Sequence, residues 1–300
     1  MKSEKLKVKN MESGRTFHFS LFTFHFSLSC VFALIFCSVS HAQRLAVLAP
    51  DKADPSRAFA ERLSGAFGEK IKMLDGDLAS AAFNSTIYAN PFNMTTDESK
   101  EVGMVIGCDF FVLVKSAIQR RSAFGRTDYF EAFAAIYLVS SRTGRLVDWR
   151  LQTFEAAKPE ASARLLADAT TRLAAEIEQK MVVIAQSELA EPEPAPMEEP
   201  PDQDSPPKAD FRSPVPYRRV KPEYTAQANF YSVTATVEIT VDLDAAGKIV
   251  RTEIVRWAGF GLDESVEKTV RAMNWRPAER NNKPLPMRFL VRYNFKKMAP

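Results

Sequence analysis

The chain has 300 residues, 46% of them hydrophobic and 26% charged, and a formal net charge of +3. These proportions are typical of globular protein and indicate no dedicated nucleic-acid surface. All three histidines and two of the three cysteines precede residue 42, and only Cys108 follows it. A chain cleaved there lacks the residues for Ser-His-Asp or Cys-His catalysis, for His/Cys zinc clusters and for an internal disulfide. We therefore expect a protein that is not an enzyme, holds no cofactor or metal, and does not bind nucleic acid.

Residues 1–42 have the pattern of an export signal. Four lysines and Arg15 are followed by a run without charged residues that continues to Arg44 and is most apolar over residues 28–39. Ser40 and Ala42 place small residues at −3 and −1 of a cut before Gln43. We predict a cleaved signal and a periplasmic protein. An uncleaved inner-membrane anchor is the alternative, because the run exceeds the roughly 20 residues that span a bilayer.

Residues 43–188 alternate between strand and helix patterns, which predicts an α/β domain. Cys108, just before the apolar run FFVLV, is expected to be a buried small hydrophobe. Thr95 and Glu98 form a capping-box signature. The expected elements are strands at 44–50, 108–118, 129–140 and 146–154, a helix that begins at Asp54-Pro55, a short helix at 77–83, a helix after Thr95, and a long helix at 159–186 with Leu165, Ala169, Leu173, Ile177, Val183 and Ile184 inward.

Residues 189–216 contain nine prolines and seven acidic residues. Such a composition offers little apolar surface to bury, so the segment is predicted to be an extended, semi-stiff linker.

The pattern of apolar and polar residues over 217–300 predicts a second domain with the element order β-β-α-β. Residues 232–243 alternate strictly between apolar and polar, Asp244 to Gly247 is a hairpin turn, and residues 248–256 return as a second strand. A helix follows, with Leu262, Val266, Val270 and Met273 on one face. The last strand is 287–295. The expected fold is a three-stranded sheet with the helix across one face and with Trp275 filling the helix–sheet seam.

In the last strand, one face carries Met287, Phe289, Val291, Tyr293 and Phe295, and the other carries Arg288, Arg292 and Asn294. The whole domain resembles the carboxy-terminal domain of TonB-type energy transducers, over about 80 of the 300 residues. The features that carry the resemblance are Pro222, Tyr224, Ala228, Asp244, Gly247, Leu262, Asp263, Trp275, Pro277, Ala278 and the strand 287–295. Thr225 departs from it where the family usually has proline, and Trp275 where it usually has phenylalanine.

The resemblance implies binding of a periplasmic segment of an outer-membrane TonB-dependent transporter, which adds as a strand to the sheet edge and supports energy-coupled transport. The residues expected to form that edge are Arg288, Phe289, Leu290, Val291, Arg292, Tyr293, Asn294 and Phe295. Arg288 and Arg292 fit two roles, because charge protects an exposed edge and also attracts an acidic peptide. Inner-membrane motor proteins and a second copy of the chain remain open as further partners.

Residues 43–188 resemble, more generally, the α/β domains of TolB-type and curli-export-type periplasmic proteins, through RLAVLAP (44–50), GCDFF (107–111) and SSRTG (140–144). A folded domain there departs from the Pro-rich spacer of TonB-type transducers. The alternative function is therefore a periplasmic scaffold that docks envelope partners through this domain, without energy transduction. An enzyme that uses Asp109, Asp128, Glu131 and Asp148 is the less favoured third interpretation, because acidic residues at strand ends are usually solvated.

Overall fold

The computed structural model describes residues 42–86, 88, 90–201 and 210–297, and all but the last residue of the signal predicted at 1–42 lies outside them. Residues 42–300 group into one compact unit. We call residues 42–190 the amino-terminal lobe and residues 211–297 the carboxy-terminal lobe. Within the described ranges, no helix is both long and apolar enough to cross a membrane.

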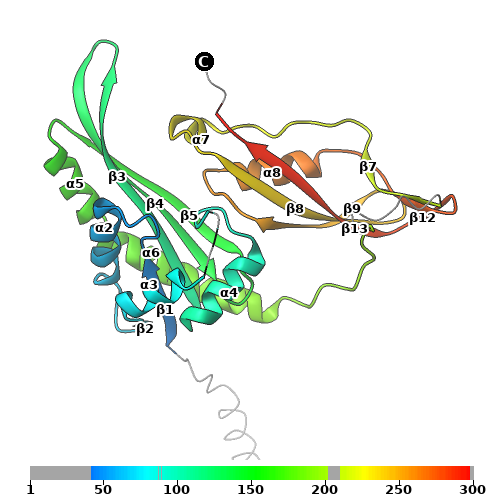
Figure 1. Cartoon of the computed structure of the whole chain (residues 1–300), viewed down its shortest axis with the longest axis horizontal. Helices are drawn as coiled ribbons and strands as arrows, with labels where there is room; N and C mark the ends of the chain where they lie inside the picture. Colours follow the sequence, from blue (N-terminus) through cyan, green and yellow to red (C-terminus); the bar gives the residue numbers. More distant parts are fainter. Residues whose placement is uncertain (1–41, 87, 89, 202–209, 298–300) are drawn as a thin grey trace, which may run out of the picture. The chain divides into compact units, whose positions relative to one another are not determined.

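The amino-terminal lobe is built on a five-stranded sheet with the order β2-β1-β3-β4-β5. Strand β1 runs parallel to β2 and β3, whereas β3, β4 and β5 are antiparallel (Figure 1). This mixed sheet, together with its helices, confirms the predicted α/β character. Its strands are β1 (Gln43–Leu48), β2 (Ile71–Met73), β3 (Phe110–Ala123), β4 (Arg126–Ser140) and β5 (Leu146–Ala156).

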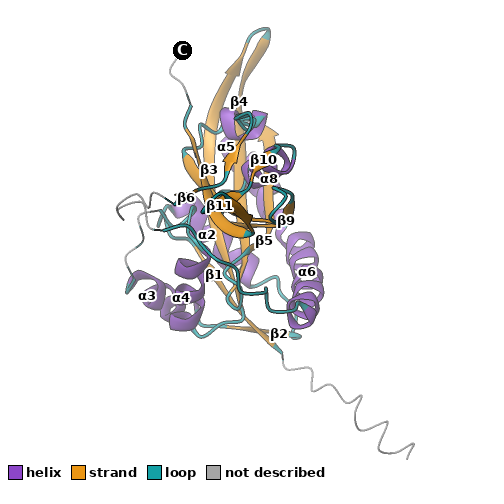
Figure 2. Ribbon diagram, turned by 90° about the vertical axis from the view of Figure 1, so that its right-hand side faces the viewer, coloured by secondary structure: helices purple, strands orange, loops and turns teal. Residues whose placement is uncertain are grey.

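Five helices accompany this sheet: α2 (Asp54–Ser64), α3 (Gly76–Asn84), α4 (Thr96–Ile106), α5 (Pro159–Asp168) and α6 (Thr170–Ala190). Apolar side chains of α2, α5 and α6 pack on one face, while those of α3 and α4, which lie side by side, pack on the other (Figure 2). Helix α4 begins with the predicted capping box, since Glu98 N–H donates to Thr95 Oγ1 and Thr95 N–H donates to Glu98 Oε2.

The predicted long helix is wrong in one respect, because Ala169 separates α5 from α6. Leu165 and Val183, predicted to face inward, are 44% and 56% exposed, and Leu166 and Met181 take buried positions instead.

The carboxy-terminal lobe contains the expected β-β-α-β unit. Its sheet has the order β13-β8-β9, and all pairings are antiparallel. Helix α8 (Leu262–Arg271) buries Leu262, Val266 and Val270. Trp275 lies at the seam as predicted, 4% exposed, with its ring 5.0 Å from that of Phe289. The strands are β8 (Ala235–Leu243), β9 (Ile249–Arg256) and β13 (Met287–Phe295).

Short strands extend this lobe into the segment predicted as linker. Strand β6 (Phe211–Arg212) pairs with β11 (Ala278–Arg280), which also pairs with β12 (Lys283–Leu285). Strand β7 (Val215–Pro216) pairs with β10 (Trp275–Arg276), and a short helix α7 (Ala226–Phe230) leads into β8. Strand pairing therefore begins before residue 217, where the sequence placed the start of the domain.

The two lobes share a hydrophobic core, which the sequence did not predict. One continuous cluster joins residues of β3, α3 and α4 to residues of β8 and α8. Trp257 is 1% exposed, and its Nε1–H lies 3.2 Å from Ser99 Oγ and 3.3 Å from the Gly144 carbonyl oxygen. The rings of Trp149 and Phe260 meet at 4.6 Å. The carboxy-terminal lobe thus covers a face of the first sheet.

Candidate functional site

The three-stranded sheet has two edge strands, β9 and β13, and the amino-terminal lobe closes the far end of β9. Thr95 forms an antiparallel bridge with Arg256, and Trp257 N–H donates to the Met94 carbonyl at 3.3 Å. Beyond the end of β9, the Asn93 side chain substitutes for a neighbouring strand. Its Oδ1 accepts from Thr236 N–H and its Nδ2 donates to the Thr236 carbonyl, each at 2.8 Å.

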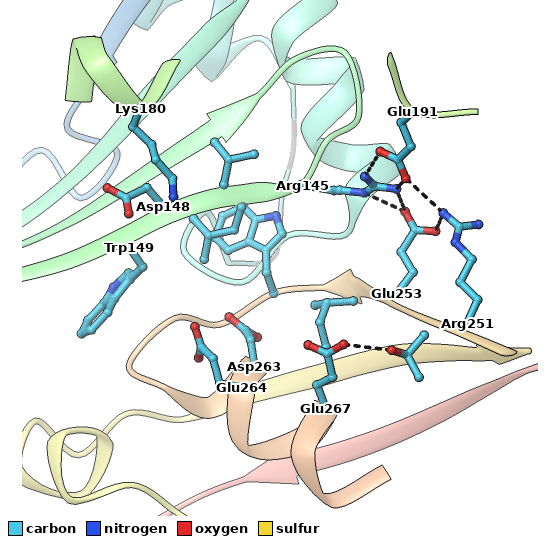
Figure 3. A pocket seen from close by; sticks show the side chains of 15 residues that line it. Arg145, Asp148, Trp149, Lys180, Glu191, Arg251, Glu253, Asp263, Glu264 and Glu267 are labelled. Carbon is cyan, nitrogen blue, oxygen red and sulfur yellow. Dashed lines mark hydrogen bonds and ion pairs between the residues drawn. The ribbon is translucent and has the colours of Figure 1, made fainter. Parts of the chain in front are cut away.

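An ion-pair network ties β9 to the rest of the molecule (Figure 3). Arg145, in the turn after β4, donates to Glu191 at 2.6 Å and to Glu253 at 2.7 Å. Arg251 reaches the other oxygen of Glu253 at 2.8 Å. A cleft of about 520 Å³ lies beside the network, and its charged lining is mainly acidic (Asp148, Asp263, Glu264 and Glu267, with Lys180). These contacts join a turn, the start of the linker and an edge strand.

Strand β13 pairs over its whole length with β8 and, like β9, with no other strand in the described ranges. Unlike β9, it forms no β-bridge with the amino-terminal lobe within those ranges. All eight residues expected at the binding edge lie in it. The main-chain N–H of Arg288 donates to the carbonyl of Glu198, 2.8 Å away. The N–H of Arg288 therefore points away from β8. Main-chain groups of alternate residues in a strand point to the same side. The groups of Leu290, Arg292 and Asn294 therefore also face outward, and we call these four positions the outer row of β13.

The remaining four predicted residues pack against the hydrophobic core. Phe289 and Phe295 are 8% and 6% exposed and belong to the core, while Val291 and Tyr293 are half-buried against it. Their main-chain groups face β8. Desolvation raises the pKa of Tyr293, and the nearby charge of Arg219 opposes that shift. These side chains hold β13 in place, so the predicted set divides into an outward half and an anchoring half.

Both arginines of β13 are engaged by carboxylates of β8. Arg288 makes two hydrogen bonds to Asp242, at 2.7 and 2.8 Å, which raise the pKa of the Arg288 guanidinium. Arg292 donates to Glu238 at 2.6 Å.

Asp242 and Glu238 are themselves buried, at 5% and 6% exposed. A buried carboxylate needs a partner, so the arginines are first of all counterions. The sequence offered one signal for this pairing: the two carboxylates of β8 and the two arginines of β13 are each four residues apart. Asp242 lies opposite Arg288 in the register, and Glu238 lies opposite Arg292.

The acidic residues of the enzyme interpretation are not brought together. Each has its own arginine partner: Asp109 with Arg44, Asp128 with Arg120, Glu131 with Arg121 and Asp148 with Arg150. Burial raises the pKa of Asp109, but the hydrogen bonds from Arg44 lower it more, and the net shift is downward. Among the described residues, no group of three or more His, Cys, Asp or Glu side chains is placed to hold a metal ion.

Cys108 is 5% exposed, and burial raises the pKa of its thiol. A thiol in such surroundings is a poor nucleophile. The prediction that Cys108 is a buried small hydrophobe is therefore confirmed.

The comparison with protein families concerns the carboxy-terminal lobe. The family model described as Gram-negative bacterial TonB protein C-terminal matches residues 220–296. The solution structure of the Pseudomonas aeruginosa TonB CTD is 16% identical, with 31% of this chain and 92% of that chain covered and a TM-score of 0.26. No curated protein matches the sequence.

Two further solved structures are similar over about half of the chain. Lipoprotein GNA1162 from Neisseria meningitidis is 13% identical, with 46% of this chain and 99% of that chain covered and a TM-score of 0.31. The hypothetical protein CT253 from Chlamydia trachomatis is 12% identical, with 49% and 95% covered and a TM-score of 0.27.

Proposed function

Because residues 220–296 are a TonB-type carboxy-terminal domain, as the sequence indicated, we propose that this protein binds a periplasmic segment of an outer-membrane TonB-dependent transporter. The segment adds as a strand to β13 and so supports energy-coupled transport. In this proposal the chain is exported through its first 42 residues, either with cleavage or with retention as an inner-membrane anchor.

The single observation that carries the proposal is the outer row of β13. Within the described ranges, the outward main-chain groups of Leu290, Arg292 and Asn294 have no protein partner. Unpaired N–H and C=O groups in a row are what an extended peptide needs for β-augmentation. Leu290 is 50% exposed at the centre of this row. The guanidiniums are already neutralised by β8, so the main chain is the principal recognition surface.

The test separates main chain from side chain at one position. Leu290→Pro removes an outward N–H that β8 does not use, whereas Leu290→Ala removes the side chain and keeps that N–H. The probe is a synthetic peptide of the periplasmic amino-terminal segment of a transporter from the same genome. We expect Leu290→Pro to weaken binding by about tenfold and Leu290→Ala to leave it nearly unchanged. If the two variants bind the peptide with equal affinity, strand addition at β13 is wrong.

A second candidate function is a scaffold that docks envelope partners through the amino-terminal lobe. The shared core favours it, since Trp257 and Asn93 fix the terminal domain to the first sheet instead of leaving it on a long tether. Affinity capture from the envelope with the full chain distinguishes the two. Partners that Leu290→Pro still captures dock elsewhere than β13, and partners that it loses use the outer row.

A further inference from the structure

The acidic linker touches the first position of the outer row. The Glu198 carbonyl accepts the hydrogen bond from Arg288 N–H, and the Glu198 carboxylate forms an ion pair with Arg280. Met197 and Pro200 are half-buried, whereas residues 191–196 are exposed. Figure 1 shows the segment after α6 reaching the beginning of β13. The linker therefore makes a local contact at this edge instead of only spanning two lobes.

The sequence around Glu198 prevents this contact from growing into a strand. In a β-ladder, residues two apart face the same neighbour. The residues two before and two after Glu198 are Pro196 and Pro200. Proline keeps its carbonyl acceptor but has no N–H to donate, so either position could form at most one of the two hydrogen bonds of a ladder pair with Leu290. In the described part of the chain, the main-chain contact between the linker and the outer row is the one hydrogen bond at Glu198.

We propose that residues 196–200 are a self-limiting internal occupant of β13, which shields Arg288 until an extended acidic segment without these prolines displaces it. This inference rests on the proposed function. The incoming segment places an acidic side chain beside Arg280, where Glu198 now lies, and continues the ladder over Leu290, Arg292 and Asn294. Until then, the occupant shortens the edge that another chain can pair with, which is a known way to limit edge-to-edge association.

Two variants of the full chain are expected to change the contact between residues 196–200 and β13 in opposite ways, one weakening it and one strengthening it. Glu198→Lys reverses the charge beside Arg280 and releases the linker, and Glu193→Lys is the matched control because Glu193 is exposed elsewhere in the linker. Pro196→Ala with Pro200→Ala restores both N–H groups and lets the ladder extend. The readouts are residue-resolved amide exchange, which needs no partner, and affinity for the transporter peptide.

One hydrogen bond corresponds to a factor of about 2 to 10 in exchange. We expect Glu198→Lys to speed exchange at Arg288 by that factor and to tighten peptide binding to a similar degree, with Glu193→Lys unchanged. The double alanine variant slows exchange at Leu290 and weakens peptide binding. Arg288 exchange that is the same in the wild type and in Glu198→Lys overturns the inference. If exchange responds as expected but no variant binds the peptide, the occupant stands and the proposed function fails.

Discussion

The two edge strands of the carboxy-terminal sheet belong to the same small domain but have opposite surroundings. At β9, the amino-terminal lobe supplies a β-bridge, the Asn93 side chain and an ion-pair network. At the outward main-chain groups of β13, the described residues supply one hydrogen bond, from Arg288 N–H to the Glu198 carbonyl. Edge strands tend to pair with whatever is available. The comparison teaches that the amino-terminal lobe covers the Arg256 end of one edge strand, whereas the linker contacts only the Arg288 end of the other.

The largest effect is expected where the two lobes join. Trp257→Ala removes a fully buried indole that joins the lobes, so it should lower the free energy of unfolding by about 3–5 kcal/mol. Denaturant titration measures this loss, and the slope shows whether both lobes still unfold together. The control is Val250→Ala. Val250 lies in β9 but is 63% exposed, so this variant should change the free energy of unfolding by less than about 0.5 kcal/mol. Equal effects of the two would mean that the lobes are not coupled through Trp257.

A second effect at the junction concerns close approach of the main chain. Gly144 has φ of 70°, and a Cβ built there would lie 1.8 Å from the carbonyl oxygen of Thr96. Gly144→Ala should therefore destabilise by about 2–4 kcal/mol, through both clash and backbone strain. Gly125 also has a positive φ of 74° but meets nothing within 4 Å. Gly125→Ala isolates the strain alone, about 1 kcal/mol, and a melting curve that ranks the two the other way would contradict this account.

At β13, the two arginines should differ in stability. Arg288→Ala leaves Asp242 buried without its two hydrogen bonds and should cost about 2 kcal/mol. Arg292→Ala should cost less than about 1 kcal/mol, because its side chain is 60% exposed and Glu238 keeps Arg256 as a second partner at 3.3 Å. Urea titrations of both variants measure the difference. Asp242→Asn combined with Arg288→Ala should recover part of the loss, which a purely packing role of Arg288 would not allow.

The smallest effect tests the register of the outer row. Leu290→Pro should change the free energy of unfolding by less than about 1 kcal/mol, because its N–H has no partner in β8. Val291→Pro, one residue further, removes a hydrogen bond to the central strand and should cost about 1–3 kcal/mol. If thermal unfolding shows Leu290→Pro to be the worse of the two, the outward positions have been assigned to the wrong alternate residues.

The strand and helix patterns were predictable because they depend on local periodicity. Strict alternation over residues 232–243 and the apolar face of α8 predicted the β-β-α-β unit, and the capping box predicted the start of α4. The Asp244–Gly247 turn also held, with Gly247 at φ of 81°. Its exact role was not visible, however. A Cβ on Gly247 would meet the Trp275 carbonyl at 2.2 Å, so two motifs far apart in sequence are fitted to each other.

The candidate site was predicted only in part. The last strand of the family resemblance is indeed an edge strand, but sequence alternation cannot tell which main-chain groups face outward, since that depends on the partner strand. Nor could it show that Arg288 and Arg292 neutralise buried carboxylates. The pairing requires β8 and β13 to be adjacent and in one register, a fact of the folded sheet.

By itself, the sequence determined the kinds of element, the TonB-type domain and the inability of the Pro-rich linker to form a long strand, because periodicity, turn residues and missing N–H groups act over a few residues. Only the tertiary structure decided that Trp257 joins the two lobes, that Thr95 bridges the Arg256 end of β9, and that Glu198 lies against Arg288. Those outcomes depend on contacts between segments of chain far apart in sequence, whose burial is decided only when the lobes pack together.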